Sequence, residues 1–361
     1  MAARVFVGLS GGVDSAVSAA LLKNQGFNVE GVFIKIWQPE FTECTWAADR
    51  LDAMRVTVAL GIPFREIDLS DDYKRMVVED MIAAYKRGIT PNPDVLCNRH
   101  IKFGSFLKYA LREGANYIAT GHYSRIKKSE IINQRDNAKS ENGYTLLRGI
   151  DANKDQSYFL YTLGREDLAR TLFPVGGLLK KQVRALAQKW KLPVAQKSDS
   201  QGLCFVGDVT MKDFLSHYIR LEGGSVLDRG GAVIGTHDGA ALYTIGQRHG
   251  FVVKRSGGDT APQYVVAVDI PANTITVSAR REDAARKEVL IDTMHWVGKT
   301  PALPLQVQAQ ARYREKARSA LISADGKNIK IVFDEQQIAA AGQSLVVYDE
   351  DVCLGGGVIL N

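Results

Sequence analysis

The stretch Ser10-Gly11-Gly12-Val13-Asp14-Ser15 separates an apolar run at residues 5–9 from a helical pattern at residues 16–24. The three parts together predict a buried strand, a loop and a helix. Two adjacent glycines let the backbone turn sharply with its N–H groups pointing inward, and the start of the helix adds further free N–H groups. The stretch therefore predicts a phosphate-binding loop. It is not a Walker A loop, because no Gly-x-x-x-x-Gly-Lys-Ser/Thr sequence occurs in the chain.

The residues after this loop continue the alternation of strands and helices. Strand patterns lie at residues 29–37, 64–69 and 117–120, and helical patterns lie at 49–60 and 71–87. This alternation predicts an α/β fold with an open parallel sheet. The polar residues 127–143 predict a surface loop or hairpin, and helical patterns return at 156–163 and 179–190.

The pattern changes beyond about residue 206. A helical stretch at residues 209–219 and Gly-rich short strands up to about residue 275 predict a small mixed α/β domain. Short strand patterns then follow at 307–313, 320–323, 329–333, 345–348 and 357–360, which predicts a small antiparallel barrel or sandwich. We therefore expect three domains, at residues 1–205, 206–278 and 279–361.

Composition and charge exclude several classes of protein. The 361 residues are 45% hydrophobic and 24% charged, which is typical of a globular chain and not of a disordered one. The net charge of +6 lies within residues 1–275, because residues 276–361 carry 11 basic and 11 acidic residues. This balance permits an anionic partner such as RNA. No signal-peptide pattern and no apolar run of about 18 residues occurs, so we expect a soluble cytoplasmic protein without membrane association.

The four cysteines are too few for a disulfide framework, and no two of them form a Cys-x-x-Cys pair. A zinc or iron–sulfur site built from local pairs is therefore disfavoured, and we expect no resident metal site. A single cysteine is most often a small buried hydrophobic residue, which is the reading kept for Cys44 and Cys353. Cys97 and Cys204 differ, because both lie in polar loops rich in Gly or Pro.

The surroundings of these two cysteines suggest reactive thiols. Cys97 ends the sequence Thr90-Pro-Asn-Pro-Asp-Val-Leu-Cys97, and the basic residues Arg99, His100 and Lys102 that follow favour a thiolate. Cys204 lies between small residues, as suits a thiol that must open to solvent.

These features together resemble one family, the tRNA-specific 2-thiouridylases of the PP-loop ATP pyrophosphatase superfamily. The matching stretches occur in the family's order and extend from residue 8 to residue 357. They are Gly8-Leu-Ser-Gly-Gly-Val-Asp-Ser15, Thr90-Pro-Asn-Pro-Asp-Val-Leu-Cys-Asn98, Thr120-Gly-His-Tyr123, Asn153-Lys-Asp-Gln-Ser-Tyr-Phe-Leu160, Gly202-Leu-Cys-Phe-Val-Gly207, Thr244-Ile-Gly-Gln-Arg248, Gln310-Ala-Arg-Tyr313 and Cys353-Leu-Gly-Gly-Gly357.

The resemblance implies a PP-loop domain of the Rossmann-like HUP type, a small mixed central domain and a C-terminal β-barrel that contacts tRNA. It implies that ATP, assisted by Mg²⁺, is bound by Gly8, Leu9, Ser10, Gly11, Gly12, Val13, Asp14, Ser15, Ile34 and Gly121. Asp14 is expected to support the loop or the metal rather than to transfer a proton. Ile34 would act through its backbone, because a β-branched residue in a strand usually lies in the core.

The implied reaction places sulfur at C2 of the wobble uridine. An oxo group leaves a urea-like ring poorly, so coupling it to AMP with release of pyrophosphate makes it a better leaving group. The resemblance assigns Cys204 as the persulfide carrier and Cys97 as the thiol that ends in a disulfide with it. The persulfide attacks directly or as hydrosulfide freed by Cys97. Asp94 is the acid/base candidate, and a carboxylate that merely caps a turn after Pro93 is the alternative.

The same resemblance implies the contacts with tRNA. Asn92, Pro93 and Asp94 would face the target base, and further contacts would come from Lys154, Asp155, Gln156, Arg312 and Tyr313. The basic residues at 312, 314, 316 and 318 form a cluster opposed only by Glu315. The implied partners are the tRNAs for Lys, Glu and Gln and a sulfur donor such as a cysteine desulfurase or relay protein. The free protein is expected to be a monomer. His122 is expected to be structural.

Three alternatives stay open at this point. Another PP-loop ligase or amidotransferase, such as an argininosuccinate synthase relative, would need no cysteine pair. A tRNA-binding module without catalysis would not need Asp14, Cys97 and Cys204 intact. A thiolase with an iron–sulfur cluster is disfavoured by the absence of local cysteine pairs.

Overall fold

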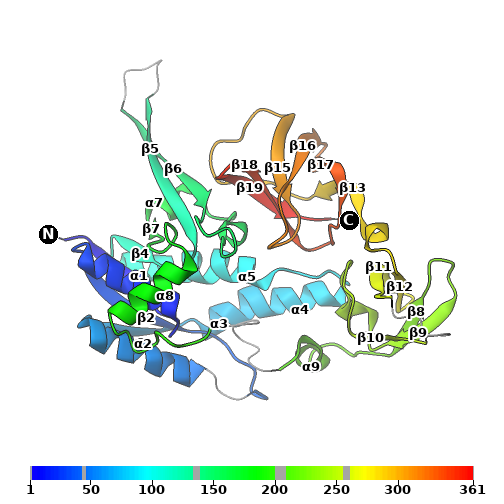
Figure 1. Cartoon of the computed structure of the whole chain (residues 1–361), viewed down its shortest axis with the longest axis horizontal. Helices are drawn as coiled ribbons and strands as arrows, with labels where there is room; N and C mark the ends of the chain where they lie inside the picture. The colour runs from blue at the N-terminus through cyan, green and yellow to red at the C-terminus, as the bar shows by residue number, and fades with distance from the viewer. Residues whose placement is uncertain (1, 43–45, 133–138, 200–208, 255–260, 361) are drawn as a thin grey trace.

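The computed structural model of the chain describes residues 2–42, 46–132, 139–199, 209–254 and 261–360. Of residues 129–132 and 139–142 it describes the backbone alone. These residues form three sheets, with helices gathered around the first of them (Figure 1). No helix among them is long and apolar enough to span a bilayer.

The first sheet is parallel and has the strand order β3-β2-β1-β4-β7. Its strands are β1 (Arg4–Gly8), β2 (Asn28–Lys35), β3 (Phe64–Asp68), β4 (Tyr117–Ala119) and β7 (Thr171–Leu172). Side chains of β1 alternate between two cores, so Val5 and Val7 face α1 (Val13–Asn24), α2 (Trp46–Leu60) and α8 (Lys180–Lys189). Phe6 faces α6 (Phe106–Arg112) and α7 (Arg165–Ala169) on the other side. This confirms the predicted open parallel α/β sheet.

A helical layer lies beyond the end of β3 and has its own core. It comprises α3 (Ser70–Tyr73), the π-helical segment η1 (Lys74–Val78), α4 (Glu79–Lys86), α5 (Pro93–Leu96) and the longer π-helical segment η2 (Cys97–Ser105). Phe214 and Leu215 of α9 (Met211–Ser216) pack into the same core. The helix predicted at residues 71–87 is therefore present, but it contains a wider turn that the pattern did not indicate.

The central sheet is mixed, as predicted, with the order β10-β9-β8-β12-β11. Its strands are β8 (Gly224–Leu227), β9 (Val233–His237), β10 (Phe251–Val253), β11 (Tyr264–Asp269) and β12 (Thr274–Ser278), with a 3₁₀ turn η4 (Ala240–Leu242). Only the β8–β12 pair is parallel among these described pairs. A second 3₁₀ turn, η5 (Arg281–Ala284), leads on to the last domain.

The last domain is an antiparallel β-barrel, which confirms that prediction. Its strands are β13 (Arg286–Ile291), β14 (His295–Trp296), β15 (Leu305–Gln310), β16 (Arg318–Asp325), β17 (Asn328–Gln337), β18 (Ser344–Asp349) and β19 (Val352–Val358). The ladder runs β13-β17-β16-β15-β18-β19, and the N–H of Leu360 closes it by donating to the carbonyl of Leu290 over 2.9 Å. The strand prediction missed β13 and β14.

The polar segment predicted as a surface loop or hairpin is a hairpin, formed by β5 (Ser124–Ile132) and β6 (Lys139–Arg148). It projects from the body of the molecule (Figure 1). At its base β6 pairs with β19, with Leu147 opposite Val352, so the hairpin extends the sheet of the barrel.

The helix predicted at residues 156–163 is wrong, because only the 3₁₀ turn η3 (Ser157–Phe159) forms there. Asp155 accepts hydrogen bonds from the N–H and the Oγ of Ser157, which hold the chain in a turn. Tyr158, Leu160 and Leu163 are then all buried between the parallel sheet and the barrel. A series of tight turns buries these side chains where a regular helix would expose part of them.

Candidate active site

The loop between β1 and α1 has the geometry of an anion-binding loop. Gly12 precedes the helix and supplies no side-chain cap, so the first N–H groups of α1 keep their donor capacity. Ser15 stabilises the turn, because its Oγ accepts from the N–H of Ser10 at 3.2 Å and donates to the carbonyl of Gly12 at 3.2 Å. Gly11 has φ +71°, and a Cβ at this position would lie 2.4 Å from the carbonyl oxygen of Asp49 in α2. Only glycine fits there.

The other residues predicted to bind ATP lie around this loop. A Cβ on Gly8 would be 3.8 Å from Cδ1 of Ile34 on the neighbouring strand, and a Cβ on Gly121 would be 2.7 Å from the backbone nitrogen of Ser15. The loop leaves the carboxyl end of β1, and Gly121 follows β4 on the opposite side from β2. Strand order reverses between β1 and β4, and such a switch point is where open α/β sheets bind ligands.

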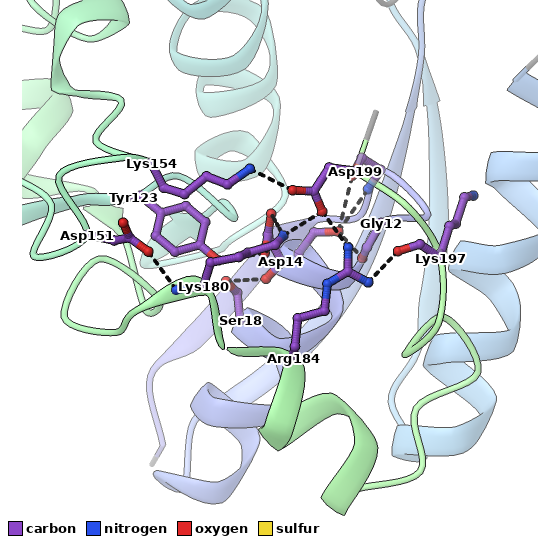
Figure 2. A network of polar contacts seen from close by, with 12 residues as sticks. Gly12, Asp14, Ser18, Tyr123, Asp151, Lys154, Lys180, Arg184, Lys197 and Asp199 are labelled. Atoms are coloured by element: carbon purple, nitrogen blue, oxygen red, sulfur yellow. Dashed lines mark hydrogen bonds and ion pairs between the residues drawn. The ribbon is translucent and has the colours of Figure 1, made fainter. Parts of the chain in front are cut away.

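A network of charged residues adjoins the start of α1 (Figure 2). Nζ of Lys180 lies 2.7 and 2.8 Å from the two carboxylate oxygens of Asp14 and 2.8 Å from Oδ1 of Asp199. Asp199 also accepts from Lys154 at 2.7 Å and from Arg184 at 2.6 Å. Burial would raise the pKa of Asp199, but the hydrogen bonds from Lys154 and Lys180 outweigh it and hold that pKa well below its usual range.

Tyr123 completes the network, since its Oη donates to Asp14 over 2.8 Å. Burial and the neighbouring Asp14 raise the pKa of Tyr123, so the phenol keeps its proton. Sequence patterns did not predict Lys180, Arg184, Asp199 or the role of Tyr123. The one available signal was the spacing of Lys180 and Arg184, which places both on one face of a predicted helix.

Carboxylate oxygens suited to Mg²⁺ are present in this network. Asp14 and Asp199 both contact the same Lys180 nitrogen. One or two carboxylates together with substrate phosphates are what protein-bound Mg²⁺ commonly uses, so these residues fit the predicted ion. Among the described residues no group of three or more His, Cys, Asp or Glu side chains could hold a metal by itself.

The segment that carries Cys97 is held at the junction of the three domains. The side-chain amide of Gln343, from the barrel, donates to the carbonyls of Thr90 and Pro91 at 2.8 and 3.2 Å. Oγ1 of Thr90 lies 2.6 Å from Oγ1 of Thr244 of the central domain. The barrel and the central domain therefore both fix the approach to the segment predicted to face the target base.

Within that segment each predicted residue has a distinct environment. Oδ1 of Asn92 caps α5 by accepting from the N–H of Val95, and Pro93 occupies the first turn. The Asp94 side chain keeps contact with solvent, yet the surrounding protein desolvates its carboxyl and raises its pKa against the smaller opposing effect of Lys102. Cys97 is 9% exposed and begins η2. π-Helical turns are rare and frequently occur at functional sites.

Cys353 and His122 are both buried. Cys353 is buried, and burial raises the pKa of its thiol to about 12, which fits the inert role expected of it. Cys44 and Cys204 lie outside the described residues. His122 is buried and bonded to Oγ1 of Thr120 at 2.7 Å, and burial lowers its pKa well below the usual value. It fits the structural role expected of it.

The residues predicted to contact tRNA are partly engaged within the protein. Lys154 pairs with Asp199, and both carboxylate oxygens of Asp155 hold the turn that includes Ser157. Oε1 of Gln156 accepts from the N–H of Tyr123 at 2.9 Å.

The barrel residues predicted to contact tRNA lie at the junction. Nη2 of Arg312 donates to the carbonyl of Ile245, and the ring of Tyr313 lies 4.3 Å from that of Phe159. The basic cluster at residues 312–318 carries less unpaired positive charge than its sequence suggests, because Arg318 pairs with Glu335 across the β16–β17 hairpin. The expectation that only Glu315 opposes it is therefore wrong. Glu315 itself pairs with Arg281 at 2.8 Å.

Comparison with known proteins identifies relatives over the whole chain. Family models described as a tRNA methyl transferase HUP domain, a tRNA methyl transferase PRC-barrel domain and an aminomethyltransferase β-barrel domain match residues 3–208, 212–279 and 286–359. A tRNA-specific 2-thiouridylase MnmA from Nitrosococcus oceani is 44% identical over 99% of this chain and 96% of the relative. The proteins of that name from Haemophilus ducreyi and Pseudomonas aeruginosa are 43% and 44% identical over 99% of this chain and 92% and 94% of theirs.

Proposed function

The chain belongs to the family of tRNA-specific 2-thiouridylases, and from that premise we propose how its residues carry out the transfer of sulfur to tRNA. It is a tRNA sulfurtransferase with a nucleotide-binding PP-loop fold. One residue links the loop to the thiol, and this observation carries the proposal. Ile34 packs against the core that includes Cys97, and it also lies beside Gly8, the residue of β1 that leads into the loop. Activation by ATP and attack by sulfur would thus occur in one place.

ATP would lie across the carboxyl ends of β1, β2 and β4. The N–H groups of Gly11, Gly12 and the first turn of α1 would hold its phosphates, with a hydroxyl donor from Ser10. The Ser15 hydroxyl would keep the turn of the loop in place. Gly8, Leu9, Val13, Ile34 and Gly121 would line the nucleoside side. Asp14 would hold Mg²⁺, which supplies neutralisation of phosphate charge when it is bound.

The first step would activate the uridine. Its C2 oxygen attacks the α-phosphorus of ATP, an O–P bond forms, and the bond from the α-phosphorus to the bridging oxygen breaks. Pyrophosphate leaves with the electron pair. The uridine then carries AMP at C2, a leaving group far better than the original oxo group.

The second step would bring sulfur from a persulfide on Cys204. The terminal sulfur attacks C2 and AMP leaves, after which the Cys97 thiolate attacks Sγ of Cys204 and releases 2-thiouridine. In the variant route Cys97 attacks first and frees hydrosulfide, which attacks C2. Either route leaves a Cys97–Cys204 disulfide, which an external thiol must reduce before the next cycle.

Recognition of tRNA would centre on the segment that carries Cys97. Asn92, Pro93 and Asp94 would face the flipped wobble base, with Tyr313 near by for stacking. Lys154 would exchange Asp199 for a tRNA phosphate, and Asp155, Gln156 and Arg312 would fix the surface around it. The substrates would be the tRNAs for Lys, Glu and Gln, and a cysteine desulfurase or relay protein would supply sulfur to a cytoplasmic monomer.

We expect Asp94→Asn to lower the rate of thiolation and, at neutral pH, to raise the stability of the fold. Loss of an acid/base group should lower the rate of thiolation by about 10²–10⁴-fold. The pKa of Asp94 is raised in the folded protein, so the folded chain binds this proton more tightly than the unfolded chain. Stability from this group is therefore present at low pH and lost as the pH rises through the folded pKa.

The variant should consequently melt at a higher temperature than the wild type near pH 7. That gain should disappear below about pH 3.9, the ordinary value for an aspartate. Melting curves across pH and single-turnover thiolation rates measure both effects. A variant with a wild-type thiolation rate would exclude Asp94 as the acid/base.

The activity itself is tested by incubating the protein with unmodified tRNA, Mg²⁺, radiolabelled ATP and a persulfide source. Nucleoside mass spectrometry should detect 2-thiouridine in the tRNA, and AMP and pyrophosphate should form in step with it. ADP as the nucleotide product, or a tRNA without sulfur, would contradict the proposal.

A further inference from the structure

We propose that Lys180, at the start of α8, is the catalytic cation that contacts the pyrophosphate leaving group of ATP. This rests on the proposed function, because it assigns a further residue to the ATP-cleaving step. The sequence of the loop, Gly8–Ser15, contains no lysine or arginine. A Walker A loop carries its own lysine to the β- and γ-phosphates. A side-chain cation for the charge that develops on departing pyrophosphate would therefore have to come from another element.

The geometry points to Lys180 for this task. Its Nζ reaches Asp14, the second residue of α1, at 2.7 and 2.8 Å, so it lies beside the free N–H groups of that helix. The side chain is 15% exposed, which limits screening by water. Its backbone N–H donates to Asp151 at 2.8 Å, which fixes the start of α8.

The contacts within the network favour Lys180 over its other cations for this task. Lys154, Lys180 and Arg184 face the carboxylates of Asp14 and Asp199, and their side chains point toward Asp199 in Figure 2. Arg184 also donates to the carbonyls of Ala195 and Lys197, so it is anchored on its own side of the network. Lys180 is the member held between the two carboxylates, and release from Asp14 would leave it paired with Asp199.

The chemical step needs nothing beyond the proposed reaction. The bond between the α-phosphorus and the bridging oxygen breaks, and its electron pair goes to pyrophosphate. An ammonium group in a preformed position stabilises that charge in the transition state. The competing explanation is structural: the Lys180–Asp14 pair could simply join α8 to α1. The two explanations differ in what they predict for pyrophosphate binding.

The test measures binding of inorganic pyrophosphate to the full chain by calorimetry in EDTA. Lys180→Ala should weaken binding about tenfold or more, since a charge-assisted hydrogen bond is lost. Lys181→Ala is the matched control, because Lys181 is the exposed next residue of the same helix, and it should bind as the wild type does. Asp14→Asn should tighten binding several-fold, since it removes the carboxylate that competes for Lys180.

Lys180→Arg keeps a cation that can pair with both carboxylates, so it controls for loss of folding and should retain most of the binding. In the complete reaction, inhibition of AMP formation by added pyrophosphate should weaken in Lys180→Ala and not in Lys181→Ala. A Lys180→Ala variant that binds pyrophosphate as tightly as the wild type would overturn the inference, as would a folded wild type that does not bind it. Formation of 2-thiouridine by the wild type in the same preparation would show that only this inference had failed.

Discussion

Replacing Cys97 by Ser should abolish the formation of 2-thiouridine while leaving activation of the tRNA by ATP in place. The hydroxyl is almost the same size as the thiol and the site is 9% exposed, so the fold should persist. A serine can neither attack a persulfide at neutral pH nor form the disulfide that ends the cycle. The thiolation rate should fall by at least about a thousandfold, the scale expected when a nucleophile is removed.

The measurement is single-turnover thiolation followed by nucleoside mass spectrometry, with pyrophosphate release followed in parallel. Cys353→Ala is the matched control, because Cys353 is buried in the core shared with the barrel and its raised pKa makes it unreactive. It should thiolate tRNA at a near wild-type rate. Full activity of the Cys97→Ser protein would rule out the two-cysteine scheme.

Gly11→Ala should prevent ATP binding, because it distorts the backbone of the phosphate-binding loop. The left-handed φ of +71° costs a non-glycine residue about 1–2 kcal/mol. The new methyl group would also lie 2.4 Å from the carbonyl oxygen of Asp49, so the loop or the start of α2 must move. Displacement of a phosphate-binding loop by about 1 Å is enough to lower turnover about a hundredfold.

Gly26→Ala separates the two contributions to this effect. Gly26 has a similar φ of +86°, but a Cβ there meets nothing within 4 Å. It should therefore lower stability by the backbone cost alone and leave the affinity for ATP unchanged. Titration of each variant with ATP, together with its melting temperature, checks this. Equal ATP affinities for Gly11→Ala and the wild type would contradict the assignment of the loop.

The sequence was sufficient where a feature depends on local pattern. Two glycines between an apolar run and a helix predicted the loop, and alternation of strands and helices predicted the parallel sheet. The expectation that Cys97 lies in a polar loop is wrong, because Asn92 caps a helical run there that continues through Cys97. The relatives named 2-thiouridylases also favour the sulfurtransferase over the ligase and the non-catalytic alternatives.

Features that depend on distant segments could not be predicted. Asp14, Tyr123, Lys180 and Asp199 come from four separate parts of the chain, and the stretches that contain Asp14 and Tyr123 do not indicate that the four side chains meet. The helix expected at residues 156–163 does not form for a local reason, because the carboxylate of Asp155 competes for backbone N–H groups. The positive charge of the cluster at residues 312–318 was overestimated because the partner of Arg318, Glu335, lies on the next strand.

Leu147 and Val352 face each other across the β6–β19 pair, although about 200 residues separate them in the sequence. Leu146 is fully buried in a core that also contains Val346, Tyr348 and Cys353. At a synthesis rate of about 5–20 residues per second, the ribosome makes β19 about 10–40 s after β6. During that interval the hairpin presents an open strand edge and an incomplete core. The catalytic domain is therefore finished only when the barrel has been synthesised and folded against it.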